Sequence, residues 1–110
     1  MTGALSVAEV RLHWREAAPA LGVSTLCVEV LRETVRSEAV STAEIADALG
    51  ITQNAAWQQL RRLRAAKLVT QRRDTHPRGA GGISYWRADP TAIAAVLDDL
   101  FIEILGDLTG

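Results

Sequence analysis

The sequence is poor in several residue types on which other classes of protein depend. It has one cysteine, Cys27, and therefore neither an intrachain disulfide nor a zinc site made of four thiolates. No apolar run approaches the ~20 residues that cross a bilayer. The first residues lack the basic leader and apolar segment of a secretory signal. We therefore expect a cytoplasmic protein that makes no contact with a membrane.

Catalytic and metal-binding groups are equally scarce. The two histidines, His13 and His76, lie in distant and dissimilar segments, so no triad of nucleophile, base and orienting acid is recognisable. Asp98 and Asp99 are adjacent on an expected helix and point in different directions, which indicates a solvated face rather than a general acid and base. His13 with Cys27 would supply two ligands where zinc needs four. We expect no enzyme, no metal site and no cofactor.

The charge is nearly balanced overall but uneven along the chain. Twelve basic residues, eleven of them the arginines typical of a GC-rich bacterial genome, oppose thirteen acids. Residues 61–87 hold eight of the basic residues and one acid, a local net charge of +7, while the rest of the chain carries −8. From Asp89 onward there are five acids and no base. Such segregation predicts one anion-facing region; alternatively, the arginines belong to a solvated helix and hairpin.

Length and apolar spacing predict one domain over residues 1–110, because a chain of this size buries one modest core. Helical spacing predicts a first helix from Ser6 to Ala18, which Pro19 with Gly22 ends. A second helix is expected from an N-cap at Ser24 to about residue 35.

A helix-turn-helix is predicted at about 42–66. The residues STAE at 41–44 form a capping box that begins one helix, and Gly50 ends it. Thr52 is the next N-cap, for a longer helix that extends to about Ala66. Since two residues separate the glycine from this helix, the two helices must cross sharply.

A hairpin and a closing helix complete the chain. Residues 68–74 and 83–89 are rich in strand formers, and the turn residues between them predict a β-hairpin, the wing, at about 68–88. The glycines between the strands match neither a dinucleotide fingerprint nor a P-loop. Asp89 and Pro90 begin a closing helix at about 90–106. The expected fold is mainly α with a small β-hairpin wing, a winged helix-turn-helix.

The segment EIADALGITQNAAWQQLRRLRAAKLV resembles ArsR-type (arsenic-repressor-type) transcriptional regulators. Their pattern reads E-L-A-x-x-L-G-hydrophobic-S-Q-x-x-V-S-x-H-L-x-x-L-x-x-x-G-L-V, and SYWRA at 84–88 is similar to their second wing strand. The resemblance spans about residues 41–105 and implies a winged-helix regulator that binds double-stranded DNA. The matching positions are Glu44, Ile45, Ala46, Leu49, Gly50, Ile51, Thr52, Gln53, Leu60, Leu63, Leu68 and Val69.

Several residues depart from the family pattern. Ala56 replaces a valine, Trp57 and Gln59 stand where the family has serine and histidine, and Lys67 replaces the glycine before the wing. No cysteine lies within 42–49 and no histidine lies in the closing helix, so the family's metal-sensing motifs are missing. The resemblance therefore implies the scaffold, and it assigns neither an operator sequence nor an effector.

The expected DNA-facing side follows from the turn of about 100° per residue in a helix. Leu60 and Leu63 face the core, and the opposite side carries Asn54, Gln58 and Arg61, whose amide and guanidinium groups pair with adenine and guanine in a major groove. Amides at the helix start and arginines of the wing tip suit phosphates or a minor groove. The predicted DNA-binding residues are Thr52, Gln53, Asn54, Trp57, Gln58, Arg61, Arg62, Arg72, Arg73, His76 and Arg78.

Two roles are possible for each of three further side chains. Trp57 either contacts a base or packs against a neighbouring helix or the wing. Arg64 either faces DNA or pairs with acids on another helix. Cys27 is either a small buried apolar residue or an oxidation-sensitive thiol.

The closing helix carries a wider apolar stripe than one small domain needs for its own core. We therefore expect a homodimer, with the first helix alongside and two recognition helices about 34 Å apart. The predicted function is that of a dimeric repressor; the alternative is a winged-helix interaction or partition-type module that binds DNA architecturally or binds protein. The predicted dimer residues are Val96, Leu97, Leu100, Phe101, Ile104 and Leu105.

Overall fold

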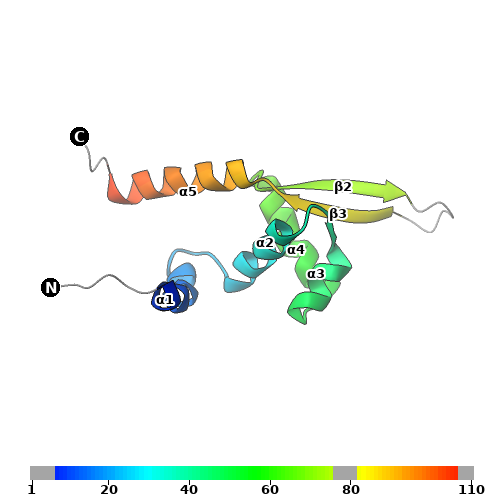
Figure 1. The fold of residues 1–110 in the computed structure, drawn as a ribbon, viewed down its shortest axis with the longest axis horizontal. Coiled ribbons are helices and arrows are strands. Elements are labelled where there is room, and N and C mark those ends of the chain that lie inside the picture. The colour runs from blue at the N-terminus through cyan, green and yellow to red at the C-terminus, as the bar shows by residue number, and fades with distance from the viewer. Residues whose placement is uncertain (1–6, 76–81, 107–110) are drawn as a thin grey trace.

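The computed structural model describes residues 7–75 and 82–106, with the side chains of 13–74 and 82–106. Its mainly helical order, with one small sheet, confirms the predicted winged helix-turn-helix (Figure 1). The elements are α1 (Val7–Ala20), α2 (Thr25–Arg36), β1 (Val40–Ser41), α3 (Thr42–Leu49), α4 (Gln53–Ala65), β2 (Val69–Thr75), β3 (Gly82–Ala88) and α5 (Pro90–Leu105).

The helix-turn-helix begins and ends where local sequence signals predict. Ser41 Oγ accepts a hydrogen bond from the Glu44 amide at 3.1 Å, and Glu44 Oε1 accepts one from the Ser41 amide at 3.1 Å, so the capping box is complete. Gly50 ends α3 with a left-handed φ of 65°. Thr52 Oγ1 then accepts from the Ala55 amide at 3.0 Å and caps α4.

One prediction about local structure was wrong in part, and one strand was missed. Pro19 does not end α1, which continues to Ala20. The ring of a proline fixes a φ close to the helical value, and near the end of a helix its missing N–H and its crowding of the carbonyl four residues earlier affect one turn only. The chain turns away from α1 at Gly22, whose φ is 77°. The sequence also missed β1, because a two-residue strand shows no alternation; its Val40 pairs with Trp86 of β3.

The sheet has the order β1-β3-β2 and is antiparallel throughout. β2 and β3 pair from Val69 opposite Ala88 to Thr75 opposite Gly82. Trp86 of β3 is fully buried, and its indole Nε1 donates to Thr42 Oγ1 at 2.9 Å. The core lies between this sheet and the helices, and its buried apolar members are Val30, Val40, Ile45, Ala46, Ala56, Leu60, Leu63, Val69 and Trp86.

The molecule is elongated, with extents of 64 × 30 × 22 Å and a radius of gyration of 16.8 Å. A compact chain of this length would have a radius of about 13 Å. The difference arises because α5 extends away from the body, above α1 (Figure 1). We expected one face of the closing helix to cover the domain's own core, but every residue from 94 to 105 is exposed. Within the described residues, no helix is long and apolar enough to span a membrane.

Candidate nucleic-acid interface

One side of α4 is free of the core and carries polar side chains. Asn54, Gln58 and Arg61 are exposed, whereas Leu60 and Leu63 on the opposite side are 0% and 4% exposed. This division follows from the helical turn, because residues three and four apart share a side. Of the predicted DNA-binding residues on α4 and its cap, Thr52, Gln53 and Arg62 are exposed as well.

Trp57 differs from these neighbours because it packs on the wing. Its ring meets that of Trp86 edge to face, with centroids 5.5 Å apart and planes at 62°. The residue is half-buried in this contact. The packing interpretation therefore describes its main contact, while one part of the side chain still lines a groove.

This groove lies between the first turns of two helices and the wing. Its volume is about 640 Å³, and Thr42 of α3, Gln53 and Asn54 of α4 and Ser84 and Tyr85 of β3 line it. Its lining residues carry hydroxyls and side-chain amides and lie at the first turns of two helices, which suits an anion such as a phosphate.

The arginines of α4 and the wing differ in whether an acid already pairs with them. In the described part of the chain the ion pairs are Arg15 with Glu29, Arg36 with Glu33 and Arg72 with Asp74. The charges of Arg61 and Arg62 on α4 therefore remain available to an external anion. Arg64 pairs with no acid on another helix; its Nη1 donates to Oε1 of Gln71 on β2.

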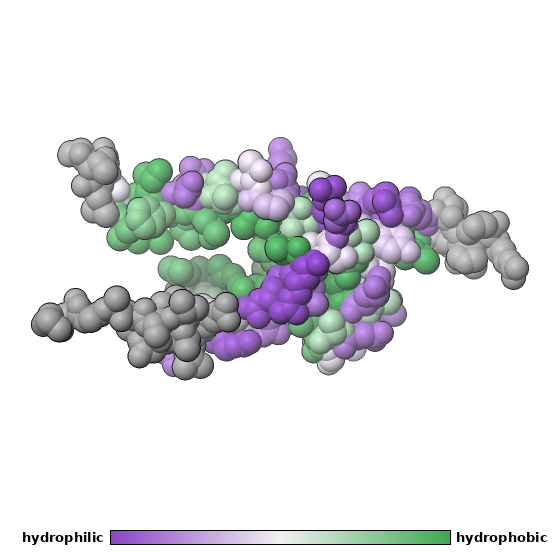
Figure 2. Space-filling model, viewed as in Figure 1, coloured by the Kyte–Doolittle hydropathy of each residue, from purple (hydrophilic) through white to green (hydrophobic). Residues whose placement is uncertain are grey.

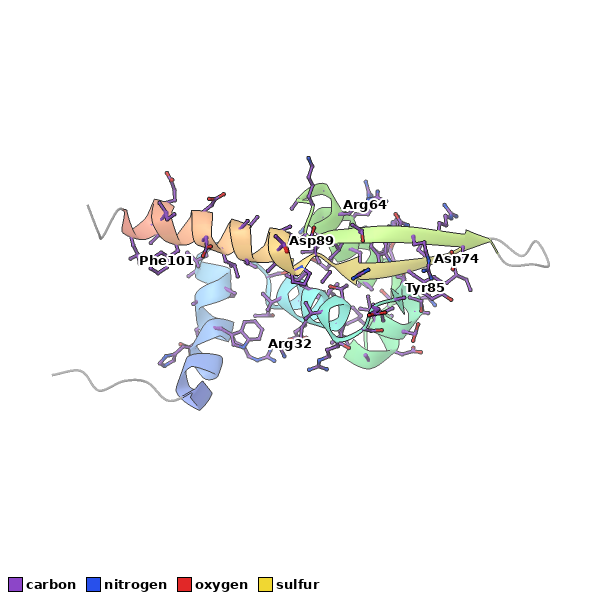
Figure 3. The ribbon with its side chains drawn as sticks, turned by 45° about the horizontal axis from the view of Figure 1, so that its top comes forward. Arg32, Arg64, Asp74, Tyr85, Asp89 and Phe101 are labelled. Carbon is purple, nitrogen blue, oxygen red and sulfur yellow. The ribbon has the colours of Figure 1, made fainter. Side chains whose placement is uncertain are left out.

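Arg72 and Arg73 lie on opposite sides of β2. Arg72 is 3.2 Å from Asp74, and its guanidinium carbon lies 5.3 Å from the centre of the Tyr85 ring. Figure 3 shows Asp74 and Tyr85 on the two strands of the wing. Arg73 crosses Gly82, where an added Cβ would lie 2.8 Å from its Nε, so a side chain at this position would require Arg73 to shift. The predicted contacts His76 and Arg78 lie outside the described residues.

Cys27 on α2 faces the helix-turn-helix and is half-buried. Burial raises the pKa of its thiol, and the nearby Arg62 guanidinium offsets part of that rise. Among the side chains of residues 13–74 and 82–106, no group of three His, Cys, Asp or Glu lies close enough together to hold a metal ion.

Several residues that shape this region were missed in the sequence. Gln71 and Ser84 connect α4 to both wing strands, and Thr42 holds the Trp86 indole. The only sequence signal is a polar residue at an inward position of an alternating strand, which becomes informative once the strand register is known. Ile102, also absent from the predicted set, is 56% exposed on α5.

The comparisons with known proteins agree with this geometry. The family model described as "MarR family" matches residues 21–78, which is more than half of the chain. No curated protein sequence matches the chain. The expectation of a winged-helix regulator is thus confirmed, whereas its finer assignment to the ArsR type is not supported.

Solved structures share the fold. NolR from Sinorhizobium fredii is 25% identical with a TM-score of 0.54, covering 96% of this chain and 98% of that chain. A mutant of S. aureus MepR, solved bound to an oligodeoxyribonucleotide, is 15% identical with a TM-score of 0.57 over 93% and 78%.

ZitR from Lactococcus lactis, a zinc-responsive MarR family member, is 23% identical with a TM-score of 0.52, and the match covers 66% of this chain. The chain spans about half of ZitR, 47% of its length. With the family model, the capped helix-turn-helix and the basic wing all in agreement, the chain belongs to the MarR family of DNA-binding transcription regulators.

Proposed function

We propose that the protein is a dimeric repressor that places α4 in the major groove of a palindromic operator. The observation that carries this proposal is the exposed side of α4, where Asn54, Gln58 and Arg61 stand free of the core. Amides pair bidentately with adenine and arginine pairs with guanine, so these side chains can read sequence. A dimer bound across a promoter would exclude polymerase, which is the basis for assigning repression.

The wing and the groove supply the contacts to the DNA backbone. A sugar-phosphate strand in the groove would meet the exposed Gln53 at the start of α4 and the basic wing strand that bears Arg73. Contacts of this kind set the position of the protein on the duplex and carry no sequence information. His76 and Arg78 extend the same basic strand in the sequence, and we assign them to phosphates or to the adjacent minor groove.

The dimer contact is assigned to α5. From Val96 to Leu105 its large apolar side chains are between 43% and 58% exposed, and Figure 2 shows green apolar residues gathered along this helix. An apolar surface of this extent marks an interface, and a two-fold partner covers it with the same surface. We assign Val96, Leu97, Leu100, Phe101, Ile104 and Leu105 to that interface.

The first helix offers a complementary surface beside it. An apolar depression of about 320 Å³ between α1 and α2 is lined by Trp14, Leu21 and Val28. The guanidinium carbons of Arg15 and Arg32 lie 4.6 and 5.5 Å from the Trp14 ring centre, and Figure 3 places Arg32 next to α1. Because Arg15 already pairs with Glu29, Arg32 is the cation at this position that favours the partner's α5, which carries acids and no base.

Footprinting on DNA upstream of the protein's own gene tests the proposal. The wild type should protect a short palindromic site, and Gln58→Ala and Arg61→Ala should each weaken specific binding by about 1–3 kcal/mol. The matched control is Arg36→Ala, an exposed arginine beside the start of α5 that should change little. Full operator selectivity in both α4 variants would contradict the proposed reading surface, and uniform coating of any DNA would support the architectural alternative.

A further inference from the structure

The side chain of Arg64 turns toward the wing, and Figure 3 shows it beside β2. Its Nη1 donates a hydrogen bond to Oε1 of Gln71, and Nε2 of Gln71 donates one to Oγ of Ser84 on β3 at 2.8 Å. These three side chains, here called the polar strut, run from the last turn of α4 across both strands of the wing.

Gln71, the central residue of the strut, forms hydrogen bonds with both its amide oxygen and its amide nitrogen. Gln71 lies opposite the buried Trp86 in the strand register, and both Gln71 and Ser84 are half-buried. Its amide oxygen accepts from Arg64 and its amide nitrogen donates to Ser84, and losing such bonds on a half-buried amide costs free energy. Both bonds form together only when the wing and α4 keep this relative position.

A second contact restrains the same side of α4. Trp57 precedes Arg64 by seven residues, about two helical turns or 10 Å, and it packs on Trp86 of β3. A helix attached to a sheet at one point can pivot about that point. With the tryptophan pair near its start and the strut near its end, α4 is held at two points.

We propose that the polar strut sets the angle between α4 and the wing, so that both contact the same DNA duplex at once. Arg64 is then a positioning residue rather than a phosphate contact. The angle determines the width of the groove between Gln53 and Ser84 and the distance from α4 to the wing cation Arg73. This inference rests on the DNA-binding surface proposed above.

The first test measures operator affinity in a double-mutant cycle. Gln71→Met keeps the side-chain length and removes both hydrogen bonds, and Arg64→Ala removes the donor. Each variant should bind operator about tenfold more weakly, and the double variant should bind no worse than either single one, because both break the same strut. Additive losses would show that Arg64 contacts DNA directly and would overturn the inference, as would full affinity of Gln71→Met.

Two further cycles serve as controls for this pattern. Arg61→Ala on the reading side of α4 should cost the same in the wild-type and Gln71→Met backgrounds. Arg73→Ala on the wing should cost less in the Gln71→Met background, because the wing is then no longer held against the duplex. Equal costs of Arg73→Ala in the two backgrounds would count against the strut.

A measurement without DNA separates this inference from the proposed function. Spin labels at Gln58→Cys and Ile83→Cys, in a Cys27→Ser background, report the distance between the exposed sides of α4 and β3. Gln71→Met should broaden the distance distribution well below the unfolding temperature, and an unchanged distribution would overturn the strut. If the wild type binds no DNA, the proposed function fails, while this distance measurement still decides whether the strut holds the wing.

Discussion

Lys67 joins α4 to the wing in a backbone conformation that disfavours a side chain. Its φ is 64°, the only positive value at a non-glycine among the described residues. The amides of Lys67 and Leu68 donate to the carbonyls of Arg64 and Leu63, the bond pair that closes a helix through a left-handed residue. A left-handed L-residue costs about 1–2 kcal/mol, which explains the glycine at this position in the ArsR-type pattern.

We predict that Lys67→Gly stabilises the protein. Relief of the left-handed strain exceeds the extra chain entropy of glycine, for a net gain of about 0.5–1 kcal/mol. Thermal unfolding should show a midpoint a few degrees higher. Gly50→Ala is the matched control: Gly50 has a φ of 65° and nothing within 4 Å of its would-be Cβ, so strain alone should lower the midpoint. An unchanged or lower midpoint for Lys67→Gly would contradict the assignment of strain.

The Cys27 thiol should react slowly with iodoacetamide. Burial raises its pKa, so less thiolate is present at pH 8 in the folded protein than in urea-unfolded chains. Arg62→Ala should slow the reaction further because the guanidinium lowers this pKa, whereas Arg61→Ala should leave it unchanged. Because the pKa is raised on folding, the stability linked to Cys27 is present below its unfolded pKa and is lost as pH rises through the folded value. Faster alkylation in the native state would refute the effect of burial.

At the scale of elements, Trp86 connects the sheet to both helices of the helix-turn-helix. It is fully buried on β3, donates to Thr42 of α3 and meets Trp57 of α4. Trp86→Phe removes the hydrogen bond and leaves a cavity, so we predict a loss of about 2–3 kcal/mol in urea unfolding. Thr42→Val, which removes only the acceptor, should cost about half as much. Equal stability of Trp86→Phe and wild type would show that this contact contributes little.

The elements differ in how well their sequence revealed them. Both ends of α3 and the start of α4 were predicted because Ser41 and Thr52 accept from amides three residues on and the Gly50 amide donates to carbonyls of the preceding turn. β1 was not predicted because Trp86, with which its Val40 pairs, is 46 residues away along the chain. The polar strut was not predicted for the same reason, because only the strand register brings Arg64, Gln71 and Ser84 together.

At the scale of the whole molecule, the dimer decides whether the protein can bind its operator. Leu100 and Ile104 are 43% and 58% exposed on the apolar side of α5. Replacing both with glutamate should give monomers in sedimentation at micromolar concentration, since charges would be buried without partners. The control is Thr91→Glu with Ala95→Glu, which places the same charges at the same spacing on the other side of the helix.

The monomeric variant should also bind operator poorly although its helix-turn-helix is intact. One recognition helix makes half of the base contacts, and the partner no longer holds a second helix about 34 Å away. Gel shifts on the full palindrome and on a half-site measure this difference. A wild-type chain that sediments as a monomer and yet binds the palindrome tightly would contradict both the dimer and the symmetric operator.

The sequence by itself determined the helix caps, the apolar sides of the helices and the concentration of positive charge between residues 61 and 87. Each of these depends on residues that are neighbours in the chain or one helical turn apart, so spacing was enough to reveal it. Only the tertiary structure decided that α5 leaves the body with its apolar side uncovered and that Trp57 packs on β3. Only the tertiary structure showed that Arg64 donates a hydrogen bond to Gln71 on the wing. These depend on which distant segments pack together, and that is settled by burial and strand register across the whole fold rather than by local preference.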